Sequence, residues 1–171
     1  RMFNGVWRSD QGLGTLAVQS HMADLPRIFI LWLTSFLLPL NILRYITMLT
    51  PLLIGPLGVY FLIKHFLSEK KFSYPSAFLG SLLYLCNLVV VQQFVVPLEM
   101  FVFHYAFLPW TFLYVFKFLE KPAKKTFALF IFFSILIVPQ AHTATLFYAY
   151  FIGLLSFLTT YLVLNLNKSN I

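Results

Sequence analysis

The feature that most limits what this chain can fold into is a succession of apolar runs that fill most of its length. The longest extends from Ile28 to Ile63, and later runs cover about residues 75–92, 100–118, 126–141 and 144–164. Several of these runs approach the roughly 20 residues that a helix needs to cross a bilayer. A soluble domain of this size cannot hide so much apolar surface, because a small globule still needs polar cover. The pattern therefore predicts an all-α, polytopic transmembrane helical bundle.

The composition agrees with a lipid environment. Of the 171 residues, 60% are hydrophobic and 10% are charged, whereas an average soluble domain is about 45–50% apolar and about 25% charged. The net charge of +7 would also suit a nucleic acid, but the lysines form short clusters between apolar runs, as they do in the cytoplasmic loops of membrane proteins. No basic stripe or aromatic platform accompanies them. We therefore expect membrane lipid, and no nucleic acid, as a partner.

The run from Ile28 to Ile63 is too long for a single span. As one helix it would extend about 54 Å, whereas the hydrocarbon core is about 30 Å thick. Pro39 and Asn41 mark the expected break, because proline cannot continue a helix interior and asparagine favours helix caps. Either residues 28–40 form a short interfacial or re-entrant helix before a span at about 43–66, or both halves span the membrane.

The distribution of basic residues favours the first arrangement. If residues 28–40 do not span, all eight lysines fall on one side of the membrane and all four arginines on the other. Lysine-rich loops face the cytoplasm. We therefore expect about five spans plus an in-plane or re-entrant helix, with residues 1–44 outside and the C-terminus in the cytoplasm. The lysines are Lys64, Lys70, Lys71, Lys117, Lys121, Lys124, Lys125 and Lys168.

Two regions follow from this topology. Residues 1–26 form an outer-face loop of mixed polarity, and residues 27–171 form the transmembrane helical region. Because the chain starts outside without a signal segment, we expect it to be a fragment of a longer protein with at least one span upstream. The glycines within the spans form no sustained small-xxx-small pattern, so we expect the helices to pack through larger side chains. These are Gly55, Gly58, Gly80 and Gly153.

The first candidate site is the loop from Trp7 to Gly14. It places the carboxylate of Asp10 beside Gly12 and Gly14. A carboxylate there could act as a general base or hold a divalent metal, and the glycines would let the backbone approach a bulky ligand. A solvated glycine turn is the simpler alternative.

Further candidates come from three other places in the chain. His21 and Asp24 precede Pro26, where Asp24 also suits a helix N-cap. Glu99 and His104 occupy the outer end of the 100–118 run, and polar groups inside a span usually face a cavity or the bundle interior. Gln140 and His142 form a polar patch after Pro139, with an ordinary turn as the alternative. In the expected topology the substrate-binding candidates His21, Asp24, Glu99, His104, Gln140 and His142 join Asp10 at the outer face.

The order of these features resembles the N-terminal part of GT-C-type membrane glycosyltransferases, especially the bacterial arabinofuranosyltransferase-like and YfhO-like groups. The likeness rests on the outward loop with Asp10 followed by an in-plane apolar segment, on the stretch Ala77–Asn87, and on Leu108-Pro109-Trp110. Those families often show A-x-L-Y-x-x-N-P and L-P-W in comparable places. Here Leu88 replaces the expected proline.

The resemblance implies a GT-C-like fold and an enzyme that transfers a sugar from a polyprenyl-phosphate donor at the outer face of a bacterial plasma membrane. Asp10 would be the catalytic base. The chain lacks the paired acidic motif expected around it, so Asp24 is the second candidate. The alternative function is a non-enzymatic transporter or flippase subunit, because spans interrupted by proline and an intramembrane histidine suit it as well. No H-E-x-x-H, Walker A or G-x-S-x-G motif supports a metalloprotease, ATPase or serine hydrolase.

Overall fold

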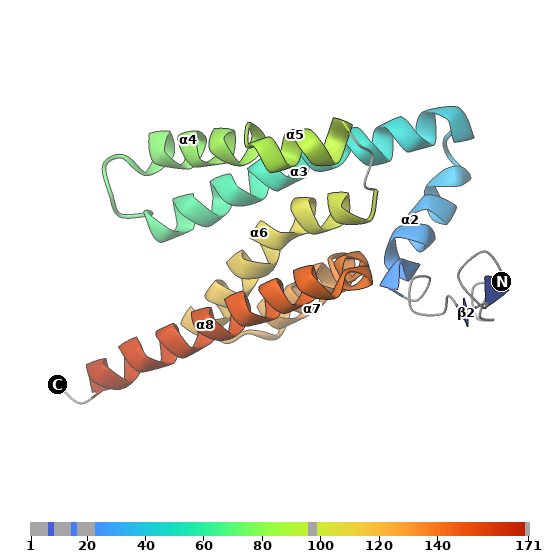
Figure 1. The fold of residues 1–171 in the computed structure, drawn as a ribbon. Helices are drawn as coiled ribbons and strands as arrows, with labels where there is room; N and C mark the ends of the chain where they lie inside the picture. The colour runs from blue at the N-terminus through green and yellow to red at the C-terminus, as the bar shows by residue number, and fades with distance from the viewer. Residues whose placement is uncertain (1–6, 9–14, 17–22, 96–98, 170–171) are drawn as a thin grey trace.

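The computed structural model describes residues 7–8, 15–16, 23–95 and 99–169. Two short strands come first, with β1 (Trp7–Arg8) antiparallel to β2 (Thr15–Leu16). From residue 23 onward the described chain is almost entirely helical, which confirms the all-α prediction (Figure 1). The helices are α2 (Leu25–Ser35), α3 (Leu40–Phe66), α4 (Ser73–Leu85), α5 (Leu88–Val95), α6 (Glu99–Glu120), α7 (Lys124–Leu136), the short 3₁₀ helix η1 (Val138–His142) and α8 (Ala144–Ser169).

Three of the described helices are long and apolar enough to cross a membrane. They are formed by Asn41–Phe66, Phe101–Glu120 and Ala144–Leu164, which lie in α3, α6 and α8. The helices α4, α5 and α7 have 13, 8 and 13 residues, each fewer than the roughly 20 that a span needs. The apolar helices thus agree with a membrane protein.

The break predicted at Pro39 is confirmed. The helix α2 ends at Ser35, and Pro39 occupies the N-cap position of α3 with an extended backbone. With 11 residues, α2 is about 16 Å long and too short to cross the hydrocarbon core. It runs across the end of α3 rather than along it (Figure 1). Its exposed side includes Trp32, whose ring contacts Phe36 with centroids 5.1 Å apart.

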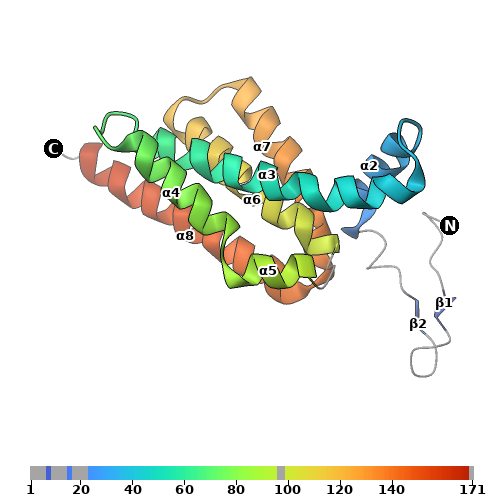
Figure 2. The ribbon, with the colours of Figure 1, turned by 90° about the horizontal axis from the view of Figure 1, so that it is seen from above.

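A second break interrupts the apolar run 75–92, which the sequence had presented as continuous. The helix α4 ends at Leu85, and α5 begins at Leu88, directly after Asn87. The side chain of Asn87 accepts a hydrogen bond from the backbone N–H of Val90 at 2.9 Å and donates one to the carbonyl of Tyr84 at 2.9 Å. One asparagine therefore caps both helix ends. The helix α4 packs along α3, whereas α5 turns away from α3 and contacts α6 (Figure 2).

The helix α6 lies at the centre of the bundle and contacts α3, α5, α7 and η1. Its buried side chains include Val102, Ala106 and Leu113. The expectation that glycines play little part in helix packing is wrong for α3, because a Cβ at Gly55 or Gly58 would lie within 3 Å of a ring atom of α6. The indole N–H of Trp110 donates to the carbonyl of Ile54 at 3.0 Å. Small residues thus allow α3 and α6 to approach closely.

The turn between α3 and α4 and the turn between α6 and α7 lie at one end of the bundle, near the C-terminus (Figure 1). Nε2 of His65 lies 2.9 Å from Oε2 of Glu120, and the hydroxyl of Tyr161 donates to the carbonyl of Leu119 at 2.9 Å. These contacts tie together the ends of α3 and α6 and the C-terminal half of α8. The lysines of the two turns therefore gather at this end, which we call the lysine end. They are Lys64, Lys70, Lys71, Lys117, Lys121, Lys124 and Lys125.

Candidate functional site

The opposite end of the bundle is formed by α2, η1 and the first turns of α6, and we call it the α2 end. There α2 contacts η1 and α7, and η1 contacts α6 and α8. The predicted residues Asp24, Glu99, His104, Gln140 and His142 all belong to these segments. The predicted residues Asp10 and His21 lie outside the described residues, as do the side chains of Glu99 and His142. The binding and catalytic roles of all seven stay predictions.

Asp24 occupies the N-cap position of α2, as the sequence predicted, but its side chain makes no capping hydrogen bond. Its carboxylate is instead paired with Arg27, whose Nε donates to Oδ1 at 2.7 Å while Nη2 contacts Oδ2. Asp24 is only 6% exposed. A buried carboxylate needs such a bidentate partner, because an unpaired buried charge is strongly unfavourable. The sequence reasoning missed Arg27, although an arginine one helical turn after an aspartate is a recognisable signal.

Arg27 lies where three helices meet. Together with Leu31, Thr47, Met48 and Phe103 it lines a small cavity of about 10 Å³ between α2, α3 and α6. This volume is about that of one water molecule. The ion pair of α2 is thus placed beside Phe103, the direct neighbour of His104.

His104 and Gln140 bring buried polar atoms without a partner to the α2 end. Gln140 is 2% exposed, and its Oε1 makes no hydrogen bond to any residue that the structure describes. Nδ1 of His104 is also buried, and it has no hydrogen-bond partner within residues 23–95 and 99–169. A buried polar atom left unpaired costs about 1–3 kcal/mol, and such atoms are rare in folded proteins and call for an explanation. Their presence agrees with a site that meets polar groups of a ligand.

The packing of α6 against α7 places these two side chains at the same level of the bundle. The ring of Phe133 contacts Phe107 and Trp110, with centroids 5.9 and 5.7 Å apart. Because α6 and α7 are antiparallel, residues after Phe133 lie level with residues before Phe107. Gln140 therefore reaches the first turns of α6, and His104 lies on the same helix face as Phe107, one turn earlier.

Ser134 contributes a third buried polar atom, and it lies closer to the middle of the bundle than His104 and Gln140. Its hydroxyl is buried and lies against the side chain of Tyr150 of α8. The sequence reasoning missed it, although a serine surrounded by phenylalanines in an apolar run was a visible signal. Among the residues that the structure describes, no group of three His, Cys, Asp or Glu could hold a metal ion. A divalent metal held by Asp10 stays a prediction.

Comparisons with known proteins identify no relative of this chain. No protein-family model, curated protein or solved structure matches the chain. The case for a function therefore rests on the arrangement of these residues.

The substitution Gln140→Met tests whether Oε1 is unpaired. Methionine has a similar length and no polar oxygen, so the free energy of unfolding should stay unchanged or rise by about 1–3 kcal/mol. Thermal unfolding of the purified protein in detergent measures the change. The matched control is Gln92→Met on α5, where the side chain is exposed and a change within about 0.5 kcal/mol is expected. A loss of more than about 1 kcal/mol in Gln140→Met alone would mean that the side-chain amide of Gln140, through Oε1 or Nε2, has a stabilising partner.

Proposed function

We propose that the chain is a multi-pass protein of a bacterial plasma membrane with five spans. The spans are α3, the pair α4–α5, α6, the pair α7–η1, and α8, and α2 is the in-plane or re-entrant helix. The two broken spans cover residues 73–95 and 124–142, close to the length that a bilayer requires. The gathering of seven lysines at the lysine end favours a cytoplasmic location for that end and an external one for the N-terminal segment.

Cysteine labelling tests this topology. In a Cys86→Ser background, Ser9→Cys should react with a membrane-impermeant maleimide added outside intact cells, whereas Lys71→Cys should react only after the membrane is opened. The physical reason is that lysine-rich loops stay on the cytoplasmic side. Labelling of both positions from the same side would contradict the proposed number of spans between them.

We further propose that the protein is a membrane glycosyltransferase of GT-C type, which takes a polyprenyl-phosphate-linked sugar donor at the outer face of the membrane. The observation that carries this proposal is the α2 end itself. A short apolar helix that cannot span the membrane lies beside the buried ion pair of Asp24 and Arg27 and the unpaired atoms of His104 and Gln140. An in-plane helix over buried polar groups suits a donor that is part hydrocarbon and part sugar phosphate.

The α2 end offers an anionic donor one described guanidinium, which is already paired with Asp24. Arg27 is the basic residue of α2, and the lysines of the two turns are all at the far end. A sugar phosphate could extend toward Arg27 and hydrogen-bond to Gln140 and His104, while the polyprenyl chain lies along the exposed apolar side of α2. Asp10, which precedes α2 in the chain, would act as the general base that deprotonates the acceptor hydroxyl.

A second function has support from a different observation. Ser134 of α7 places a further buried polar atom within the bundle, and two of the proposed spans are interrupted, one at Asn87 and the other at Pro139. Transporters bind polar substrates between broken helices near the middle of the membrane. A non-enzymatic transporter or flippase subunit for a lipid-linked or small polar substrate is therefore the alternative.

One experiment distinguishes the two functions. The full-length protein is reconstituted into liposomes with radiolabelled polyprenyl-phosphate arabinose and an oligosaccharide acceptor, and both the labelled acceptor and the donor exposed on each leaflet are measured. A transferase should produce labelled acceptor and free polyprenyl phosphate. Movement of the intact donor between leaflets without labelled acceptor would instead support the flippase. If neither labelled acceptor nor movement of the donor is detected, a function with this donor is contradicted.

A further inference from the structure

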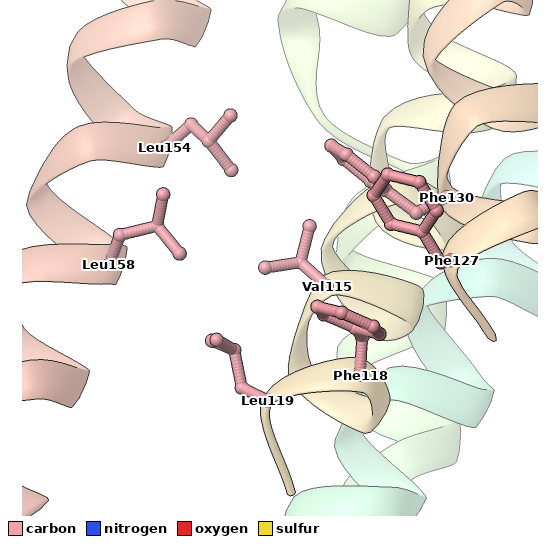
Figure 3. Close-up of a pocket in the computed structure, with 7 residues that line it drawn as sticks. All are labelled: Val115, Phe118, Leu119, Phe127, Phe130, Leu154 and Leu158. Atoms are coloured by element: carbon pink, nitrogen blue, oxygen red, sulfur yellow. The ribbon is translucent and has the colours of Figure 1, made fainter. Parts of the chain in front are cut away.

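An apolar groove lies between α6, α7 and α8 in the half of the bundle near the lysine end, away from the candidate site. It has a volume of about 180 Å³. Figure 3 shows Leu154 and Leu158 of α8 directed across it toward Val115 of α6. Its lining consists of side chains without polar groups, namely Val115, Phe118, Leu119, Phe127, Phe130, Leu154 and Leu158.

The groove is held open by large rings on one side of α8. Phe157 contacts Phe112 and Phe116 of α6 with ring centroids 5.9 and 6.1 Å apart, and Tyr161 donates its hydroxyl to the carbonyl of Leu119. These contacts hold α8 at a distance from α6. An apolar cavity of about 150 Å³ can bind a molecule of the size of benzene, so this groove has room for a segment of a hydrocarbon chain.

A second hollow continues the groove toward the turn between α6 and α7. It shares Phe118 and Phe127 with the groove and is also lined by Pro122, Ala123 and Lys124. The groove and this hollow together form an apolar channel, and Lys124 lies at its mouth, next to the turn between α6 and α7. Lys121 and Lys125 lie next to this mouth in the chain and are exposed.

The charges around the mouth are strongly unbalanced. Residues 117–125 contain four lysines and one acid, Glu120. The Glu120 carboxylate lies against His65 of α3, on a different side of α6 from the groove. Lys117 lies over the ring of Tyr114 at 5.4 Å. Lys121, Lys124 and Lys125 are therefore the cations available to an anion at the mouth.

We infer that this channel binds an anionic phospholipid, with part of an acyl chain in the groove and the phosphate at Lys121 and Lys124. An apolar chain matches the lining, and a negative headgroup matches the lysines at the membrane surface. A helix of another protein would fill the groove but would leave these lysines without a counter-charge. The site is independent of the proposed sugar transfer, because it shares no residue with the α2 end.

The headgroup contact is tested by lipid retention. The full-length protein is purified with phosphatidylglycerol or with phosphatidylcholine, and native mass spectrometry measures the fraction that keeps one lipid. Each lysine near a membrane surface changes the affinity for an anionic lipid about fivefold. The double substitution Lys121→Gln, Lys124→Gln should therefore weaken phosphatidylglycerol retention about 25-fold and leave phosphatidylcholine unaffected. The control Lys70→Gln, Lys71→Gln removes two charges from the other turn and should have little effect. An equal loss in both double variants would overturn the site.

The chain contact is tested separately. Leu158→Trp should fill the groove and reduce phosphatidylglycerol retention at least tenfold, whereas Leu155→Trp, at an exposed neighbouring position of α8, should not. Retention by Leu158→Trp at the level of the unmodified protein would overturn the role of the groove. A phosphatidylglycerol with a photoreactive group on its acyl chain provides a test without substitution. We expect cross-links to residues 115–119 and 154–158, and cross-links elsewhere only would contradict the inference.

Discussion

Gly58→Leu should lower the free energy of unfolding by about 3 kcal/mol. Gly58 is buried where α3 meets α6, and a Cβ at this position would lie 2.7 Å from Nε1 of Trp110 and 3.0 Å from Cβ of Pro109. Adding atoms to a packed interface typically costs about 1–3 kcal/mol. Leucine would also displace the indole from its 3.0 Å hydrogen bond to the carbonyl of Ile54, so we expect the upper end of that range.

Thermal unfolding of the purified protein in detergent measures this loss, and Gly153→Leu is the matched control. A Cβ at Gly153 would meet nothing within 4 Å, and leucine has a higher helix propensity than glycine. The control should therefore be neutral or slightly stabilising. Equal losses in both variants would show that close approach of α3 and α6 is not what stabilises the bundle.

The parts of the fold that depend on local chemistry could be predicted from the sequence. Pro39 ends one helix and starts another because proline lacks a backbone donor and disfavours helix before it. The position of α2 as a separate short helix followed from this break and from its length. The lysines could be assigned to one end because alternate turns of a helical bundle meet at the same end.

The parts that depend on contacts between helices could not be predicted in the same way. Hydrophobic periodicity does not distinguish Gly55 and Gly58 from other apolar residues. Only the register between α3 and α6 places them against Tyr105 and Trp110. Asn87 looked like one polar residue in an apolar run, yet its side chain caps two helices at once. A single sequence contains the residues but not the register that pairs them.

The candidate site shows the same division. The sequence was sufficient to select His104 and Gln140 as polar residues at the ends of apolar runs. It suggested that Asp24 caps a helix, but the pairing of its carboxylate with Arg27 depends on how the first turn of α2 is formed. Ser134 was overlooked because a single hydroxyl in a span can always bond to its own helix, and its position against Tyr150 of α8 is a property of the fold.

Asp10→Asn should reduce sugar transfer by two to four orders of magnitude while the protein still folds. The amide cannot accept the proton of an acceptor hydroxyl, and the loss of a general base typically lowers the rate about 10²–10⁴-fold. Transfer is measured in the liposome assay described above, and the melting temperature in detergent shows whether the fold is intact. The effect should appear in the rate of transfer more than in the apparent affinity for the donor.

Two variants make this result specific. Ser9→Ala changes the neighbouring residue without removing a carboxylate and should keep at least half of the activity. Asp24→Asn tests the second candidate base, and because it breaks the pair with Arg27 it should also lower the melting temperature. Full activity of Asp10→Asn would exclude Asp10 as the base. If Asp24→Asn then abolished transfer at a temperature well below its melting point, the base would be Asp24, and the reaction would take place beside the first turn of α2.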